Sequence, residues 1–211
     1  MRPNVASLIR LMLVTDDQLL GGRDLIALAR AAERGGVTSI QVRLKHLAAR
    51  ELADLVRTLI TAVQIPILVN DRPDVALAAG AAGTHLGPDD LPVQLARRIA
   101  PPGFLIGASV GSEVEAAAAT DADYWGIGPW RSTATKGDAG PPLGAAGFRR
   151  LVQLGGARAC IAIGSVTVDD VGSVAAGGGR GVAVSAGILA APDVEAAARS
   201  YAAAVASAFP A

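Results

Sequence analysis

The chain has 211 residues, enough for one domain spanning residues 1–211 whose core buries roughly 70% of the unfolded surface. Nineteen Lys and Arg balance nineteen Asp and Glu, which argues against a basic nucleic-acid-binding surface, and the single cysteine, Cys160, excludes an internal disulfide framework. The apolar run Leu8–Val14 is interrupted by Arg10 and is too short to span a bilayer, and no secretory signal pattern is present. We therefore expect no membrane partner and a location in the cytoplasm.

Eight short apolar runs recur along the chain, and each is followed by a loop and a helix-period segment. Most of them are continuously apolar rather than alternating, which is typical of strands buried on both faces. In chain order the predicted strands are Leu11–Thr15, Ser39–Arg43, Ile67–Val69, Thr84–Leu86, Leu105–Ala108, Tyr124–Ile127, Cys160–Ile163 and Gly181–Val184.

Amphipathic segments between these runs predict helices, among them Asp24–Arg34, Ala48–Ala62 and Phe148–Leu154. Local signals support further helix boundaries. Ser112 and Glu115 have the spacing of a capping box, Pro92 has the position of a first-turn proline, and Thr167 is placed to cap a helix that ends near Ala176. The pair Gly35-Gly36 predicts the end of a helix before the second strand.

Eight consecutive strand–helix units predict a single (β/α)₈ barrel, the TIM-barrel fold of the α/β class. A doubly wound open sheet alternates in the same way and is the alternative. The sequence Thr15-Asp16-Asp17 follows the first strand, where a dinucleotide-binding sheet would have a glycine fingerprint, so we favour the barrel.

In such a barrel the functional residues gather at the carboxyl ends of the strands. Gln41, Arg43 and Lys45 occupy alternate positions at the end of the second strand, so all three can point into the barrel mouth. Two cations and an amide at one place favour an anionic ligand; a solvated strand end is the alternative.

Carboxylates follow the third and fourth strands. Asn70 and Asp71 follow the third, and His85, Asp89 and Asp90 follow or end the fourth. Two carboxylates from neighbouring strand ends can share one Mg²⁺, although each aspartate can equally cap a helix. We expect His85 to have a packed or hydrogen-bonded structural role, and catalysis is the alternative.

The remaining strand ends carry small and hydroxyl residues. Ser109 follows the fifth strand, and the long connection after the sixth carries Thr133, Thr135 and Lys136 in a glycine-flanked loop that suits a phosphate. The seventh strand leads to Gly164-Ser165 and the eighth to Ser185-Ala186, where TIM barrels frequently bind phosphate.

These motifs together resemble the thiamine-phosphate synthase family over about Leu11–Ile188. The matching residues, in the family's order, are Gln41-x-Arg43-x-Lys45, Val69-Asn70-Asp71-Arg72, His85-Leu86-Gly87-x-x-Asp90, Gly107-x-Ser109, Thr133-x-Thr135-Lys136 and Asp138-Ala139-Gly140. The chain departs from the family pattern at Trp130-Arg131-Ser132 and at Ser165. It departs again after the eighth strand, where the family's serine would fall on Ala186 and this chain has its serine one position earlier, at Ser185.

The resemblance implies a transferase that joins a hydroxymethylpyrimidine diphosphate to a thiazole phosphate, releasing pyrophosphate and forming thiamine monophosphate. It implies that Gln41, Arg43, Lys45 and Asn70 bind the pyrimidine diphosphate and that Asp71 and Asp90 ligate Mg²⁺. Ser109 and Lys136 would act on the diphosphate or the departing pyrophosphate. Thr133 and Thr135, with the loops at Gly164-Ser165 and Ser185-Ala186, would hold the thiazole phosphate.

Two other functions remain as alternatives at this point. A related thiazole tautomerase uses the same barrel but carries an acid–base histidine in the loop after the sixth strand, where this chain has Pro129. A non-catalytic barrel that binds a phosphorylated metabolite and regulates a partner would need neither the two aspartates nor Lys136. A homo-oligomer is compatible with either function.

Overall fold

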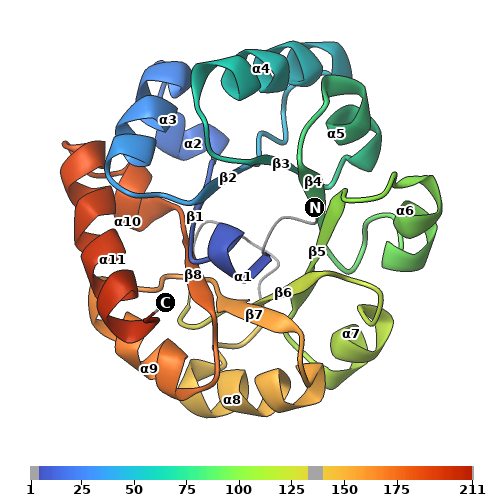
Figure 1. Ribbon diagram of the computed structural model, residues 1–211, viewed down its shortest axis with the longest axis vertical. Helices are drawn as coiled ribbons and strands as arrows, with labels where there is room; N and C mark the ends of the chain where they lie inside the picture. The colour runs from blue at the N-terminus through green and yellow to red at the C-terminus, as the bar shows by residue number, and fades with distance from the viewer. Residues whose placement is uncertain (1–4, 133–139, 211) are drawn as a thin grey trace.

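The computed structural model describes residues 5–132 and 140–210, and within them eight parallel strands form a closed ring. The strands are β1 (Leu11–Val14), β2 (Ser39–Val42), β3 (Ile67–Asn70), β4 (Gly83–Leu86), β5 (Leu105–Val110), β6 (Tyr124–Ile127), β7 (Ala159–Ala162) and β8 (Gly181–Val184). Pairing of Leu11 with Val182 joins β1 to β8 and closes the barrel (Figure 1). The predicted (β/α)₈ barrel is confirmed, and the alternative of an open sheet is wrong.

Helices surround the ring on its outside (Figure 1). After the strands in turn come α2 (Asp17–Leu20) and α3 (Leu25–Arg34), α4 (Ala49–Ala62), α5 (Pro73–Ala79), α6 (Val93–Ile99), α7 (Glu113–Ala118), α8 (Gly144–Gly155), α9 (Val171–Ala176), and α10 (Ala186–Leu189) with α11 (Val194–Ala208). Their apolar faces and the outward faces of the strands form one large buried cluster. Among the described residues, no helix has both the length and the apolar character needed to cross a membrane.

Several predicted boundaries shift for local reasons. Pro92 is the residue before α6 rather than its first residue, with an extended backbone. The Ser112 hydroxyl accepts a hydrogen bond from the Glu115 N–H, as a cap should, but the Glu115 carboxylate bonds the N–H of Gly111 instead of that of Ser112. Only half of the predicted capping box therefore forms. The helix predicted at Phe148–Leu154 begins earlier, at Gly144.

The other helix signals are confirmed. α3 ends at Arg34, directly before Gly35, and Gly36 adopts a positive φ of 99°. Thr167 precedes a short 3₁₀ turn (Val168–Asp170) that continues into α9 and ends at Ala176. The Thr167 hydroxyl and backbone N–H both donate to the Asp170 carboxylate, at 2.8 Å each, so the carboxylate secures this helix start.

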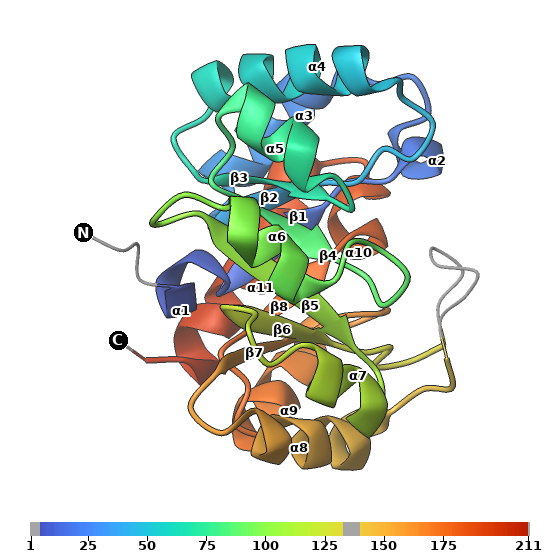
Figure 2. The same ribbon diagram turned by 90° about the vertical axis from the view of Figure 1, so that its right-hand side faces the viewer.

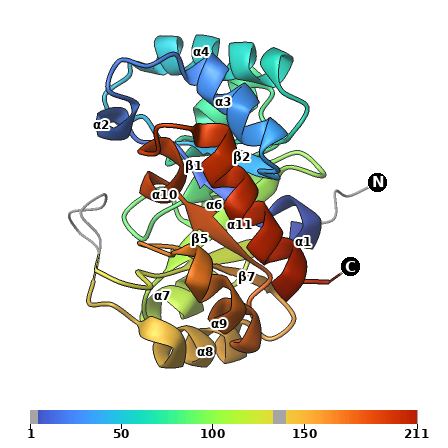
Figure 3. The ribbon, with the colours of Figure 1, turned by 90° about the vertical axis from the view of Figure 1, so that its left-hand side faces the viewer.

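One end of the barrel is closed by the segment that precedes β1. The short helix α1 (Val5–Leu8) lies at the amino ends of the strands, whereas α2 and α10 lie at the opposite end (Figures 2 and 3). Leu8 and Ile9 pack on the inward-facing side chains Met12, Leu68, Leu105, Tyr124, Ile161 and Ala183. The interior is thus a packed core with a floor, and the open end is the one at the carboxyl ends of the strands.

Candidate active site

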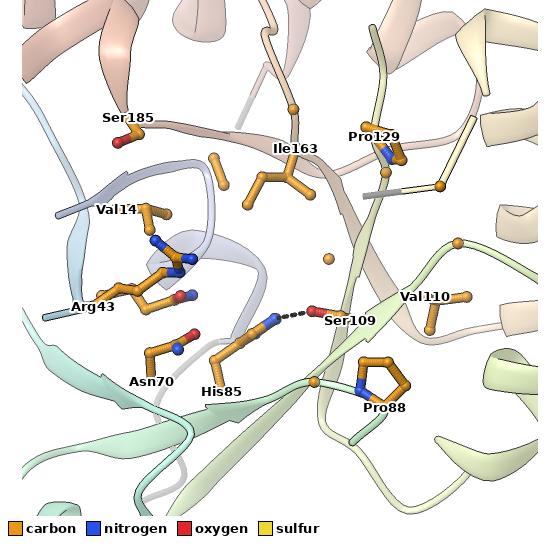
Figure 4. A pocket seen from close by; sticks show the side chains of 18 of the residues that line it. Val14, Arg43, Asn70, His85, Pro88, Ser109, Val110, Pro129, Ile163 and Ser185 are labelled. Carbon is orange, nitrogen blue, oxygen red and sulfur yellow. Dashed lines mark hydrogen bonds between the residues drawn. The ribbon is translucent and has the colours of Figure 1, made fainter. Parts of the chain in front are cut away.

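A cavity of about 620 Å³ opens at the carboxyl ends of the strands (Figure 4). Every expected site residue that the structure describes lines it: Gln41, Arg43, Lys45, Asn70, Asp71, Asp90, Ser109, Gly164, Ser165, Ser185 and Ala186. These residues come from six different strand ends, so the parallel barrel brings together positions far apart in the chain.

The basic residues after β2 are held by the acidic turn after β1. The Arg43 guanidinium donates to the Asp16 carboxylate at 3.0 Å, and both side chains are almost buried, with 14% and 11% of their surface exposed. The backbone N–H of Arg43 donates to the Thr15 hydroxyl, and the backbone N–H of Lys45 donates to the Asp17 carboxylate, each at 2.8 Å. The Arg43 guanidinium is therefore an oriented, largely buried cation on the cavity wall, whereas the Lys45 side chain lines the same cavity and is exposed to solvent.

Asp71 and Asp90 lie next to each other, although they follow different strands. Burial, a hydrogen bond with Asp90 and the charge of Asp90 together raise the pKa of Asp71 to about 6, against the lowering effects of Lys45 and Arg43. A bound cation would offset this repulsion directly. Among the described residues no group of three or more Asp, Glu, His and Cys side chains could hold a metal, so this pair would need oxygens from a ligand or water.

The backbone around these aspartates is built for the site rather than for helix capping. Asp71 has a positive φ of 64°, and its N–H donates to the His85 carbonyl at 2.8 Å. The Asp90 carboxylate accepts from the Gly87 N–H at 2.6 Å. α5 and α6 are preceded by Arg72 and Pro92, so the alternative interpretation of the two aspartates as helix N-caps is wrong.

His85 lies inside β4 and points into the barrel, with only 4% of its surface exposed. Its Nδ1 is 3.0 Å from the Tyr124 hydroxyl. Its Nε2 is 3.1 Å from the Ser109 hydroxyl (Figure 4). Glycine on the neighbouring strands leaves space for both rings. A Cβ at Gly107 would collide with Tyr124, and one at Gly126 would lie 3.0 Å from the His85 Cε1.

The loops after β7 and β8 present small residues to the cavity. Gly164 has a φ of 94°, and a Cβ there would lie 2.7 Å from the Cα of Pro129. Ser165 also has a positive φ, 52°, and its hydroxyl donates to the Ser132 carbonyl at 3.0 Å. The Ser185 hydroxyl is buried and has no hydrogen-bond partner among residues 5–132 and 140–210. An unpaired buried hydroxyl on a cavity wall is an open position for a ligand oxygen.

Thr133, Thr135 and Lys136 lie outside the described residues, as do Asp138 and Ala139. Trp130 and Arg131, which precede them, contact neighbouring elements of the barrel. Trp130 is buried against Phe148 with ring centroids 5.5 Å apart, and the backbone N–H of Trp130 donates to the Ile163 carbonyl at 2.7 Å. The Arg131 guanidinium binds the Asp170 carboxylate through two nitrogens. This part of the connection is therefore fixed beside the loop after β7.

Three residues of the site could not be assigned from the motifs alone. Asp16 holds Arg43, Tyr124 contacts His85 from inside the barrel, and Glu115 lines the cavity while bonding the Gly111 N–H. The available signal for Asp16 was its position directly after the first strand, at a carboxyl end. Tyr124 had no such signal, because it begins a strand as an ordinary aromatic core residue would.

The mouth of this closed (β/α)₈ barrel carries two basic residues, a pair of carboxylates and short loops that contain glycine and serine. These features are typical of an enzyme that binds phosphorylated small molecules. The family model described as thiamine monophosphate synthase matches residues 11–188. The thiamine-phosphate synthase of Methanoculleus marisnigri is 47% identical over 195 residues, covering 90% of this chain and 92% of that protein. That of Azorhizobium caulinodans is 43% identical over 197 residues, covering 91% and 92%.

Among solved structures, thiamine phosphate pyrophosphorylase from Pyrococcus furiosus superposes with a TM-score of 0.87 at 33% identity, covering 97% of this chain and 99% of that one. A 3-hexulose-6-phosphate synthase superposes with a TM-score of 0.65 at 16% identity, which is a likeness of fold alone. The chain belongs to the thiamine monophosphate synthase family. The family expected from the motifs is confirmed, and with it the expectation of a transferase that acts on small molecules.

Proposed function

We propose that this chain condenses a hydroxymethylpyrimidine diphosphate with a thiazole phosphate, forming thiamine monophosphate and pyrophosphate. The observation that carries this proposal is the convergence of Arg43, Lys45, Asp71, Asp90 and Ser109 on one cavity from four strand ends. The names of the relatives agree with it.

The pyrimidine diphosphate would bind on the β2–β3–β5 side. Gln41 and Asn70 carry amides that can bond a pyrimidine ring, and Arg43 and Lys45 are cations beside them. Asp16 holds the Arg43 guanidinium through one nitrogen, Nη1. A planar guanidinium has five N–H donors, so Arg43 keeps donors for a diphosphate.

The Asp71–Asp90 pair fits Mg²⁺. Burial and the neighbouring Asp90 raise the pKa of Asp71 even though Lys45 and Arg43 lower it, so a metal ion between the two carboxylates would relieve an unfavourable arrangement. Mg²⁺ in such sites typically binds one or two carboxylates and completes its shell with phosphate oxygens and water. A bound Mg²⁺ would supply positive charge to the diphosphate oxygens; Asp71 and Asp90 would hold it.

The thiazole phosphate would bind at the loops after β7 and β8. Gly164 lets the backbone approach closely, Ser165 and Ser185 carry hydroxyls, and the first residue of α10, Ala186, presents its N–H at a helix start. Thr133 and Thr135 would complete this subsite from the connection after β6.

The chemistry needs charge stabilisation more than proton transfer. The C–O bond between the pyrimidine methylene and the diphosphate breaks, the electron pair leaves with pyrophosphate, and the thiazole nitrogen then forms the new C–N bond. Arg43, Lys45, Ser109 and Lys136 would stabilise the charge on the departing pyrophosphate. The ring nitrogen attacks with its own lone pair, so no side chain has to remove a proton from it. The walls of the cavity would limit the access of water to the pyrimidine cation.

The test is an assay of the purified protein with both substrates and Mg²⁺, in which pyrophosphate and thiamine phosphate are measured separately. The proposal expects both products in equal amounts and neither when one substrate is omitted. Isomerised thiazole phosphate without pyrophosphate would instead establish a tautomerase. Saturable binding of the substrates with no turnover would establish a regulatory barrel. The cytoplasm is the compartment that we propose for this reaction.

A further inference from the structure

A chain of polar contacts runs through the barrel interior to Ser109. Tyr124 is fully buried, and its hydroxyl lies 3.0 Å from the His85 Nδ1; the His85 Nε2 lies 3.1 Å from the Ser109 Oγ. Ser109 is at the cavity wall, whereas Tyr124 belongs to the core cluster near the closed end. His85 thus links Tyr124 to Ser109 through one contact on each ring nitrogen.

Two of the acceptors near the Tyr124 hydroxyl differ greatly in strength. The first is the imidazole Nδ1 at 3.0 Å, and the second is the Met12 thioether sulfur at 4.0 Å. A thioether is a weak acceptor, while the unprotonated nitrogen of a neutral imidazole is a good one. Gln41 also hydrogen-bonds the phenol, and its amide can serve as the donor to the phenolic oxygen. The Tyr124 proton is therefore best placed on the line to His85.

Burial keeps Tyr124 a phenol. Desolvation raises the pKa of Tyr124 far above its usual range, against a lowering by Gln41, so the hydroxyl keeps its proton. If this proton is donated to Nδ1, the imidazole carries its own proton on Nε2. The Nε2–H then donates to the Ser109 oxygen.

We infer that Tyr124 acts as a positioning residue that makes Ser109 a hydrogen-bond donor toward the cavity. Ser109 receives one hydrogen bond from His85, so its single O–H proton is free to point at an anionic ligand oxygen. With the opposite imidazole tautomer, Ser109 would donate to Nε2 and turn lone pairs toward the anion. Tyr124, at the centre of the barrel, thereby determines whether the Ser109 hydroxyl at the barrel mouth donates or accepts a hydrogen bond toward the ligand. This inference rests on the proposed function only in its last step, the contact of Ser109 with the diphosphate.

The tautomer of His85 is measurable without any substrate. The protein has two histidines, His46 and His85, so ¹⁵N-histidine labelling gives few signals, and His46→Gln assigns them. At about pH 8.5, roughly two units above the usual histidine pKa, we expect the His85 proton on Nε2. We expect Tyr124→Phe, which removes only the hydroxyl, to abolish this fixed preference. A proton on Nδ1 in the wild-type protein, or a doubly protonated ring, would overturn the inference whatever the enzyme assay gives.

The matched control is Tyr201→Phe. Tyr201 is the other tyrosine of the chain, and its buried hydroxyl donates to the Val166 carbonyl at 2.9 Å, away from His85. This variant loses a comparable buried hydrogen bond, and we expect it to leave the His85 tautomer unchanged. An equal change of tautomer in both variants would show that general loosening, and not the Tyr124 proton, is responsible.

Kinetics separate positioning from folding. We expect Tyr124→Phe to lower kcat on the order of tenfold, less than the 10²–10³ of losing a charge-stabilising donor outright. The KM for the thiazole phosphate should not change. In a Ser109→Ala background the Tyr124→Phe substitution should have no further effect on kcat, because its target is gone. Additive losses in the double variant would contradict a role through Ser109. Absence of activity in the wild-type protein would instead refute the proposed function and leave the tautomer result standing.

Discussion

The carboxyl groups of Asp71 and Asp90 share a hydrogen bond across the ends of β3 and β4. Burial and this neighbour raise the pKa of Asp71 to about 6, although Lys45 and Arg43 act in the opposite direction. The pair therefore destabilises the folded protein whenever both groups are ionised and no metal ion is bound between them. Their position has a consequence for stability that can be measured.

We expect Asp71→Asn to raise the Tm of the metal-free protein above about pH 6. The native pKa of Asp71 lies above its usual 3.8, so protonated Asp71 stabilises the fold below about pH 4 and this stabilisation disappears as the pH rises through about 6. The variant should lack this pH dependence and also the Tm increase that Mg²⁺ gives the wild type. Thermal unfolding from pH 4 to 8, with chelator or Mg²⁺, tests both. A Mg²⁺ effect that survives in the variant would contradict the ligand assignment.

The only two lysines of the chain, Lys45 and Lys136, are both expected at the site. We expect pyrophosphate with Mg²⁺ to protect both side chains from acetylation, because an ammonium bound to a phosphate is a poor nucleophile. Mass spectrometry of peptides reports each lysine separately, and the N-terminal amine serves as an internal control. Modification of Lys136 at an unchanged rate would remove it from the diphosphate subsite. We further expect Lys136→Ala to lower turnover by about 10²–10³.

Asp16→Asn should weaken binding of the pyrimidine diphosphate. Asparagine is as good a helix N-cap as aspartate, so the bonds from the Gln18 and Leu19 N–H groups to Asp16 can persist. The charged partner of Arg43 is lost, and we expect the KM for the diphosphate to rise several-fold with a smaller change in kcat. Asp54→Asn is the control, because Asp54 pairs with Arg57 on the exposed surface. Similar kinetic changes in both variants would show that Asp16 has no particular role.

Ser185→Ala should raise the KM for the thiazole phosphate at little cost in stability. The Ser185 hydroxyl is buried without a partner among the described residues, so its removal breaks no described hydrogen bond. Ser39→Ala is the matched control, since the Ser39 hydroxyl is likewise buried and unpaired but lies at the start of β2, away from the cavity. Both variants should unfold at nearly the wild-type temperature. An unchanged KM in Ser185→Ala would refute a phosphate contact there.

The fold was predictable because buried parallel strands are continuously apolar. The predicted ends of all eight strands lie within two residues of the ends in the structure. The alternation of Gln41, Arg43 and Lys45 also predicted correctly that all three line the mouth. The contact of Arg43 with Asp16 was not predictable in the same way, because it depends on the register that pairs Val14 with Gln41. The Glu115 carboxylate bonds Gly111 instead of Ser112, a choice that sequence spacing does not determine.

His85 shows where motif reasoning stopped short. A hydrogen-bonded structural role was the expectation, and its contacts with Tyr124 and Ser109 agree with it. Its place on the cavity wall was not evident, because a histidine in a strand can face either side. The glycines at positions 107 and 126, which leave room for Tyr124 and His85, become meaningful only once the strands are paired.

The floor that α1, Leu8 and Ile9 build under the barrel makes the cavity a dead end. Both substrates and both products must pass the same entrance. A ligand can therefore enter or leave only past the loops at the carboxyl ends of the strands, and any molecule that fills this entrance delays the release of whatever is bound behind it.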